Sequence, residues 1–245
     1  KIRASGSLQP LSDQPLDATE MEKLLREICP PRRWQDFLER KDLDLAHEIP
    51  GVARFRGNYL YNHWGQAAVF RQIPAKILSF EELKLPEALK KLCHLNEGLV
   101  VVTGPTGSGK STTLAAMIDY INTHLSRHII TIEDPIEYTH PHNKSLITQR
   151  EVGVDTDSWE AALHNTLRQA PDVILIGEIR HKETMEHAIA FAETGHLALG
   201  TLHANNSNQA MDRVINFFPE ARRHQLLMDL SLNLKAVISQ RLIPL

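Results

Sequence analysis

The 245-residue sequence is poor in the features that mark secreted, membrane-spanning and zinc-stabilised proteins. Its 2 cysteines, Cys29 and Cys93, lie far apart and match neither a disulfide framework nor the paired spacing of a zinc module. No apolar run approaches the ~20 residues that span a bilayer, and the first residues do not form a signal peptide. We therefore expect a cytosolic protein without direct membrane insertion.

The sequence also lacks an excess of charge of either sign. Its formal net charge is −3 and its pI is near 6.5, so it shows none of the basic character that indicates a nucleic-acid partner. With 42% hydrophobic residues, the chain is long enough for one large or two ordinary domains. It begins at Lys1 without a methionine and stops in the apolar run Val237–Leu245, so we expect a fragment at both ends.

The amino-terminal part of the chain predicts a small α/β domain. Apolar residues recur at helical spacing over 19–28, and a second short helix is expected around 34–38. Between 43 and 73 the period shifts towards two. This predicts an antiparallel sheet with turns near Gly57 and Gly65.

From residue 87 onward, expected strands alternate with expected helices, which is typical of a parallel sheet covered on both faces. A capping box of Asp157 and Glu160 is expected to begin the clearest helix. We therefore predict an amino-terminal domain over 1–73, a linker over 74–86 and an α/β domain over 87–245. The expected strands are 99–103, 128–132, 173–176 and 197–202, and the expected helices are 112–125, 157–170 and 184–194.

The segment Gly104–Ser111 fits the phosphate-binding template G-x-x-x-x-G-K-[ST] in full, after an apolar strand and before a helix. Glycines let the backbone turn so that successive N–H groups point at phosphate oxygens. Lys110 would contact the β- and γ-phosphates, and the Ser111 hydroxyl would bind Mg²⁺. A glycine-rich turn that binds nothing leaves the Lys-Ser pair unexplained. The predicted nucleotide-binding residues are Gly104, Pro105, Thr106, Gly107, Ser108, Gly109, Lys110, Ser111 and Thr112.

Three further motifs follow expected strands, at the sheet edge where α/β proteins bind ligands. The acids of Glu133–Glu137 can hold Mg²⁺ or activate water, although a solvated acidic loop would look the same. Glu178 ends an apolar strand, the Walker B arrangement, and would bind Mg²⁺ directly or through water. His203 can donate to a γ-phosphate, although a lone histidine is more often structural.

The order, wording and spacing of these motifs resemble the ATPases of the type IV pilus and type II secretion superfamily. The resemblance rests on six segments of the sequence. Two lie near the amino terminus, VARFRGNYLY and AVFRQIP, and four contain the motifs described above: GPTGSGKSTTLAAMI, TIEDPIEY, LRQAPDVILIGEIR and AETGHLALGTLHANN. IEYTHPHNKS and GEIRHKETMEHA favour the retraction group (PilT/PilU), on its PilU side. The resemblance implies a PAS-like amino-terminal domain and a RecA-like P-loop NTPase domain.

The same resemblance implies roles for individual residues. Glu178 matches the Walker B glutamate, which would bind Mg²⁺ with Ser111. Glu137 would polarise the attacking water, with Glu133 as the second acid of this "Asp box". His203, and with it His196, match the "His box". Three arginines match those that contact the γ-phosphate of a neighbouring subunit, although their spacing alone fits a solvent-facing strand: Arg54, Arg56 and Arg71.

The implied function is a homo-hexameric, Mg-ATP-hydrolysing motor for type IV pilus retraction and twitching motility. It would act on an inner-membrane platform protein, with a paralogous retraction ATPase as a further candidate partner. Two alternatives stay open. One is an ATPase of a type II or type IV secretion or pilus-extension system, which a Cys-x-x-Cys pair after Leu245 would support. The other is a nucleotide-binding accessory subunit that depends on a partner motor.

Overall fold

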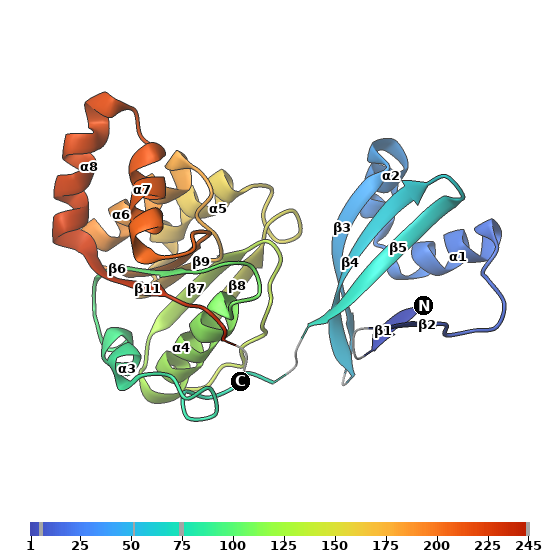
Figure 1. Cartoon of the computed structure of the whole chain (residues 1–245), viewed down its shortest axis with the longest axis horizontal. Helices are drawn as coiled ribbons and strands as arrows, with labels where there is room; N and C mark the ends of the chain where they lie inside the picture. Colours follow the sequence, from blue (N-terminus) through green and yellow to red (C-terminus); the bar gives the residue numbers. More distant parts are fainter. Residues whose placement is uncertain (5–6, 51, 74–75, 244–245) are drawn as a thin grey trace. The chain divides into compact units, whose positions relative to one another are not determined.

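The computed structural model describes residues 1–4, 7–50, 52–73 and 76–243. The chain divides into two compact units, Lys1–Pro74 and Ala75–Leu245 (Figure 1). Both units are α/β, and, as predicted, the main sheet of the first is antiparallel and that of the second is parallel. None of the helices in the described part of the chain has the length and apolarity that crossing a membrane requires.

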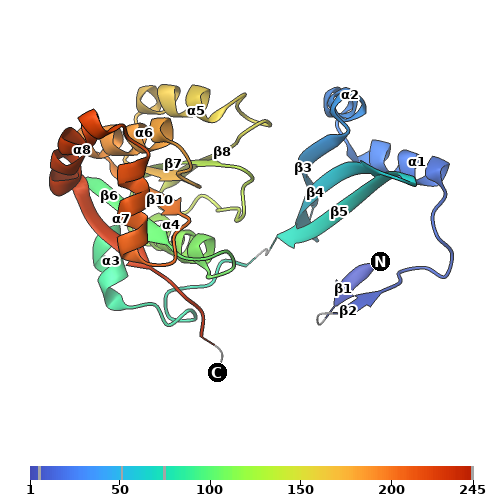
Figure 2. The same cartoon turned by 45° about the horizontal axis from the view of Figure 1, so that its top comes forward.

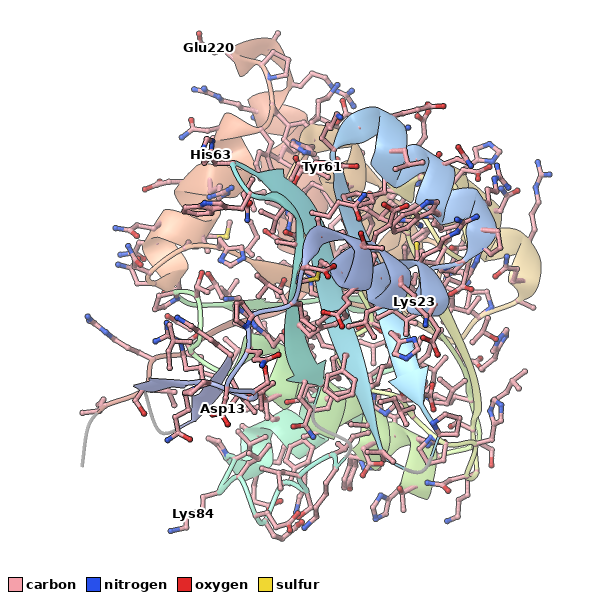
Figure 3. The ribbon with its side chains drawn as sticks, turned by 90° about the vertical axis from the view of Figure 1, so that its right-hand side faces the viewer. Asp13, Lys23, Tyr61, His63, Lys84 and Glu220 are labelled. Carbon is pink, nitrogen blue, oxygen red and sulfur yellow. The ribbon has the colours of Figure 1, made fainter. Side chains whose placement is uncertain are left out.

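In the first unit, two helices pack against one face of a three-stranded sheet (Figure 3). Its core lies between them, and the hydroxyl of the buried Tyr59 donates to the carbonyl oxygen of Leu25 at 2.9 Å. This bond joins the sheet to the first helix. The elements are β1 (Ile2–Ala4), β2 (Ser7–Gln9), α1 (Ala18–Ile28), α2 (Pro31–Arg40), β3 (Asp42–Ile49), β4 (Ala53–Asn62) and β5 (Gly65–Ile73).

One predicted turn in this sheet is wrong. β4 runs unbroken through Gly57, and the chain turns at His63 and Trp64, directly before Gly65, whose φ is +116°. A Cβ placed on Gly57 would lie 2.9 Å from the ring of Phe70 on the neighbouring strand. Glycine therefore stands at this position because an aromatic ring packs against the strand, and not because the chain reverses.

The second unit contains six parallel strands in the order β11-β6-β10-β9-β7-β8. Every residue of β6, β9 and β10 is buried, as expected for central parallel strands covered on both faces. The strands are β6 (Gly98–Thr103), β7 (His128–Glu133), β8 (Leu146–Glu151), β9 (Val173–Ile176), β10 (Leu197–Leu202) and β11 (Leu234–Ser239).

Helices cover both faces of this sheet, as the alternating pattern predicts (Figures 1 and 2). One face carries α3 (Glu87–Cys93) and α4 (Lys110–His124). The other carries α5 (Trp159–Thr166), α6 (Lys182–Glu193), α7 (Ser207–Asn216) and α8 (Glu220–Asn233). Within the predicted linker, Phe80 is only 3% exposed and belongs to the α3–α4 core.

The boundaries of α5 differ from the sequence prediction. Ser158 caps the helix by accepting a hydrogen bond from the Ala161 amide at 3.1 Å, so the predicted capping box of Asp157 and Glu160 does not form. The helix ends at Thr166 and continues as a short 3-10 turn. A serine hydroxyl one residue later satisfies the same free amides, which the sequence pattern does not distinguish.

Candidate functional site

The predicted motifs meet at one edge of the second unit's sheet. They follow β6, β7, β9 and β10, which are parallel and adjacent in the order β6-β10-β9-β7. Because parallel strands end at the same edge, the phosphate-loop template, the acidic loop, Glu178 and His203 come together there.

The loop between β6 and α4 is shaped for a phosphate. Gly107 and Gly109 have φ values of +78° and +89°, a region that other residues rarely adopt. No described side chain caps the amino terminus of α4, so its first amides remain open to an anion. The hydroxyl of Ser108 is buried, with the residue 3% exposed, and has no hydrogen-bond partner among the described residues. A phosphate oxygen would satisfy these donors, so the loop fits a nucleotide.

Lys110 lies inside this loop, with only 7% of the residue exposed. Its Nζ donates to the carbonyl oxygens of Gly104 at 3.0 Å and Pro105 at 3.1 Å. Burial lowers the pKa of Lys110, and the charges of Glu178 and Glu137 oppose this shift. The ammonium group therefore lies within the loop, close enough to both predicted acids for their charges to act on it.

Glu178 follows β9 and has a cationic or polar partner at each oxygen. Arg180 Nη2 lies 2.6 Å from its Oε2, and His203 Nε2 lies 3.2 Å from its Oε1. Burial by itself would raise the pKa of Glu178, but Arg180, with smaller contributions from His203 and Lys110, outweighs it and the pKa is lowered. Glu178 is therefore an ionised carboxylate, as a Mg²⁺ ligand must be. Arg180 stands two residues after Glu178 in the GEIR segment, but no role was expected for it from the sequence.

His203 follows β10 in a loop that is held on both sides. Arg213 Nη1 donates to its carbonyl oxygen at 3.0 Å, and Thr103 Oγ1 donates to the Ala204 carbonyl oxygen at 3.0 Å. Burial and then the charge of Lys110 lower the pKa of His203, against the opposing charge of Glu178. The imidazole is therefore neutral at pH 7, and its Nε2 lies 3.2 Å from a carboxylate oxygen of Glu178.

His196 does not join this site. It precedes β10, and its Nδ1 lies 3.0 Å from Thr194 Oγ1 and 3.2 Å from the Phe191 carbonyl oxygen, at the end of α6. The six-residue strand β10 separates it from His203. The geometry gives His196 a structural contact at the opposite edge of the sheet.

Glu133 and Glu137 lie in different environments. Glu133 is buried at the end of β7, where it accepts hydrogen bonds from Thr131 Oγ1 at 2.7 Å and from the Glu137 amide at 3.3 Å. Burial raises the pKa of Glu133 to about 7, although these hydrogen bonds act in the other direction. Glu137 is exposed. Glu133 therefore holds the backbone of the acidic loop, while the Glu137 carboxylate is available to a ligand.

The raised pKa of Glu133 predicts a pH-dependent stability. Because the folded chain binds this proton more tightly than the unfolded chain does, protonation of Glu133 stabilises the fold. Below the ordinary pKa of 4.5 the group is protonated in both states, and this stabilisation is fully present. As the pH rises from 4.5 through about 7, the unfolded chain ionises first and this stabilisation is lost. Across this pH range the free energy of unfolding of the unmodified protein should fall by about 3 kcal/mol because of Glu133. In Glu133→Gln, which cannot ionise, this contribution to the fall should be absent. Urea denaturation of both proteins at several pH values tests this, and parallel curves would contradict it.

The three predicted arginines lie in the first unit. The β4–β5 register places Arg56 directly opposite Arg71, and alternation along β4 places Arg54 on the same side as Arg56. Tyr59 and Tyr61, which pack with the α1–α2 core, point to the other side. The sheet thus gathers the three arginines on its face away from the helices, which we call the arginine face.

A pocket of about 780 Å³ opens beside the phosphate loop. Its walls are residues 104–106 of the loop, residues 203–205 after β10, and Gln209, Asp212 and Arg213 of α7. The pocket thus reaches the loop from the side of His203. Neither α7 nor the strand β8 was among the elements expected from the sequence.

Comparison with known proteins decides the family. The sequence profile described as "Type II/IV secretion system protein" matches residues 39–245. The chain belongs to the type II/IV secretion system protein family. Its relative "Type IV pilus ATPase PilU" of Pseudomonas aeruginosa is 52% identical over 243 residues, which cover 99% of this chain and 64% of that protein.

Further relatives within the family support the same branch. "Type IV pilus retractation ATPase PilT" of Pseudomonas aeruginosa is 46% identical over 242 residues, covering 99% of this chain and 70% of that protein. The crystal structure titled as the pilus retraction motor PilT with bound ADP superposes with a TM-score of 0.94 at 47% identity, covering 99% of this chain and 71% of that one. The resemblance to the PilT/PilU group and the RecA-like fold class are confirmed. The chain spans about two thirds of the length of these relatives.

Proposed function

We propose that this chain is the nucleotide-hydrolysing part of a motor that powers type IV pilus retraction. The observation that carries the proposal is the meeting of Lys110, Glu178 and His203 at a phosphate-shaped loop. Relatives in the same family are named as pilus ATPases, and the PilT structure contains ADP. We infer from these names that the substrate is a nucleotide, and we propose Mg-ATP.

The chain's own groups divide the work of binding. Lys110 Nζ would exchange the carbonyl oxygens of Gly104 and Pro105 for phosphate oxygens, and the unpaired Ser108 hydroxyl would donate beside it. Ser111 and Glu178 would hold Mg²⁺. A bound Mg²⁺ supplies charge neutralisation on the β- and γ-phosphate oxygens.

Hydrolysis would depend on the acidic loop and on His203. Glu137 is exposed and polarises the attacking water, while Glu133 fixes its backbone. The neutral His203 would turn its Nε2–H from Glu178 to the γ-phosphate, and its return to Glu178 would follow phosphate loss.

The arginine face would act between subunits of a homo-hexameric ring. Arg54, Arg56 and Arg71 would contact the γ-phosphate bound by a neighbouring copy, so that hydrolysis releases one subunit from the next. Repeated around the ring, this movement would drive an inner-membrane platform protein from the cytoplasmic side. A paralogous retraction ATPase would be a further partner.

Sharing of arginines between subunits predicts a dominant effect. Arg56→Ala mixed with unmodified protein should lower ATP turnover below the value expected for simple dilution, because each altered subunit disables its neighbour's site. Arg40→Ala, an exposed arginine at the end of α2, is the matched control. Turnover measured across mixing ratios decides the question, and a loss strictly proportional to the fraction of Arg56→Ala would count against sharing.

The proposed function is tested by steady-state ATP hydrolysis over a range of protein concentrations. Turnover that rises with assembly supports a ring motor. Tight ATP binding with negligible turnover at every concentration would instead identify an accessory subunit that needs a partner ATPase. Restoration of pilus retraction in cells that lack their own retraction ATPase would separate this function from secretion or pilus extension.

A further inference from the structure

Gln240, the residue after β11, contacts the phosphate-binding loop at both of its ends. Its backbone N–H donates to the carbonyl oxygen of Thr103, the last residue of β6, at 2.8 Å. Its side-chain Oε1 accepts from Thr113 Oγ1 in the first turn of α4 at 2.9 Å. Its Nε2 donates to the carbonyl oxygen of Gly109 at 3.4 Å. One residue therefore joins the strand that enters the loop to the helix that leaves it.

The loop is also packed tightly against Gln240. A Cβ on Gly104 would collide with the Gln240 carbonyl oxygen, and a Cβ on Gly109 would lie 3.0 Å from Gln240 Nε2. Thr113 is itself fully buried, so its hydroxyl depends on this glutamine. Two glycines of the template, Gly104 and Gly109, are thus required for a second reason besides their backbone angles. Gln240 approaches them so closely that a side chain would not fit.

We propose that Gln240 is a positioning residue that holds the phosphate-binding loop in its binding shape before nucleotide arrives. A loop that is already ordered loses less conformational entropy when it binds. Gln240 carries no charge, so its contribution is geometric and leaves the salt dependence of binding unchanged. The part of this inference that concerns nucleotide rests on the proposed function, whereas the part that concerns loop order does not.

The test uses Gln240→Met, which keeps the side-chain length and removes both hydrogen-bonding groups. Hydrogen exchange of the amides of residues 104–110 in nucleotide-free protein should become roughly 5- to 10-fold faster. The dissociation constant of a fluorescent ATP analogue with Mg²⁺ should rise about 10-fold. Turnover at saturating ATP should change less than about 2-fold while KM rises, because the reacting groups are untouched.

Three companion variants sharpen the result. Thr113→Val removes the partner hydroxyl, and the double variant should be no worse than Gln240→Met alone, because the two residues act through one contact. Gln225→Met makes the same chemical change on the exposed surface of α8 and should alter neither readout. Should Gln240→Met fail to fold, Thr113→Val carries the same test.

The outcomes separate the two proposals. Unchanged exchange in residues 104–110 and unchanged affinity in a folded Gln240→Met protein would overturn the positioning role. Faster exchange in a protein whose unmodified form binds no ATP analogue would support loop positioning and overturn the proposed function. Faster exchange throughout the second unit would mean that Gln240 only stabilises the fold.

Discussion

Lys110→Ala should weaken Mg-ATP binding by about 100-fold or more. Lys110 Nζ donates to two carbonyl oxygens of the loop, and each charge-assisted hydrogen bond that it makes to phosphate instead contributes about 1.5–3 kcal/mol. The loss should be larger than for a surface lysine because burial leaves little water to replace the ammonium group. Without nucleotide, Lys110→Ala should stay folded, because the two hydrogen bonds that it loses are to backbone oxygens of the loop.

Titration with a fluorescent ATP analogue measures this effect. Lys144→Ala, an exposed lysine in the same unit, controls for a general loss of positive charge. Lys110→Arg keeps the charge but not the shape of the ammonium group, and should also bind poorly. Equal affinity for Lys110→Ala and the unmodified protein would remove the phosphate loop from the binding site.

Glu178→Gln should lower ATP turnover by about 100-fold or more, while the affinity for nucleotide stays the same or increases. Glu178 is an anion close to Lys110, and it neutralises Arg180 at 2.6 Å. Glutamine keeps the size of the side chain and removes the negative charge, so the site becomes more positive towards phosphate. It also makes a poorer Mg²⁺ ligand, and the γ-phosphate transition state loses its stabilisation.

Phosphate release under saturating ATP, measured beside the binding titration, separates the two effects. Glu186→Gln is a matched control, because Glu186 also pairs with an arginine, Arg222 at 2.9 Å, but on the surface of α6. We expect the control to hydrolyse ATP normally. Turnover of Glu178→Gln at the unmodified rate would exclude Glu178 from the chemistry, and a parallel loss of binding and turnover would point to a structural role.

Most of the site's location could be predicted from the sequence because its residues lie in short motifs at strand ends. Lys110, Glu178 and His203 each follow an apolar strand within a few residues, and parallel pairing then brings those ends together. The local pattern and the general rule for parallel sheets were sufficient. The edge strand β8 was missed because its polar residues lack the apolar run of a central strand.

What the sequence could not predict depends on contacts between distant segments. Gln240 meets Thr113 only because β11 pairs with β6, and no local pattern contains both residues. Gly57 looks like a turn residue until the ring of Phe70 is placed beside it.

Glu133 and Glu137, two of the three acids of TIEDPIEY, show the same limit. Their residue type and spacing are equivalent in the sequence, and either could hold Mg²⁺ or activate water. Only the buried end of β7 makes Glu133 a hydrogen-bond acceptor for its own loop and leaves Glu137 exposed. The difference between them is one of solvation, which motif spacing does not contain.

The pairing of Arg56 with Arg71 bears on attempts to make this protein more heat-resistant. Like charges directly opposite on neighbouring antiparallel strands destabilise a sheet, and this pair lies in such a position. A stability-guided design would replace one of the two first. If the arginine face works as proposed, the same replacement would produce a more heat-resistant protein whose arginines no longer contact the phosphate of the neighbouring subunit. Screening for thermal stability alone would therefore favour variants without motor activity.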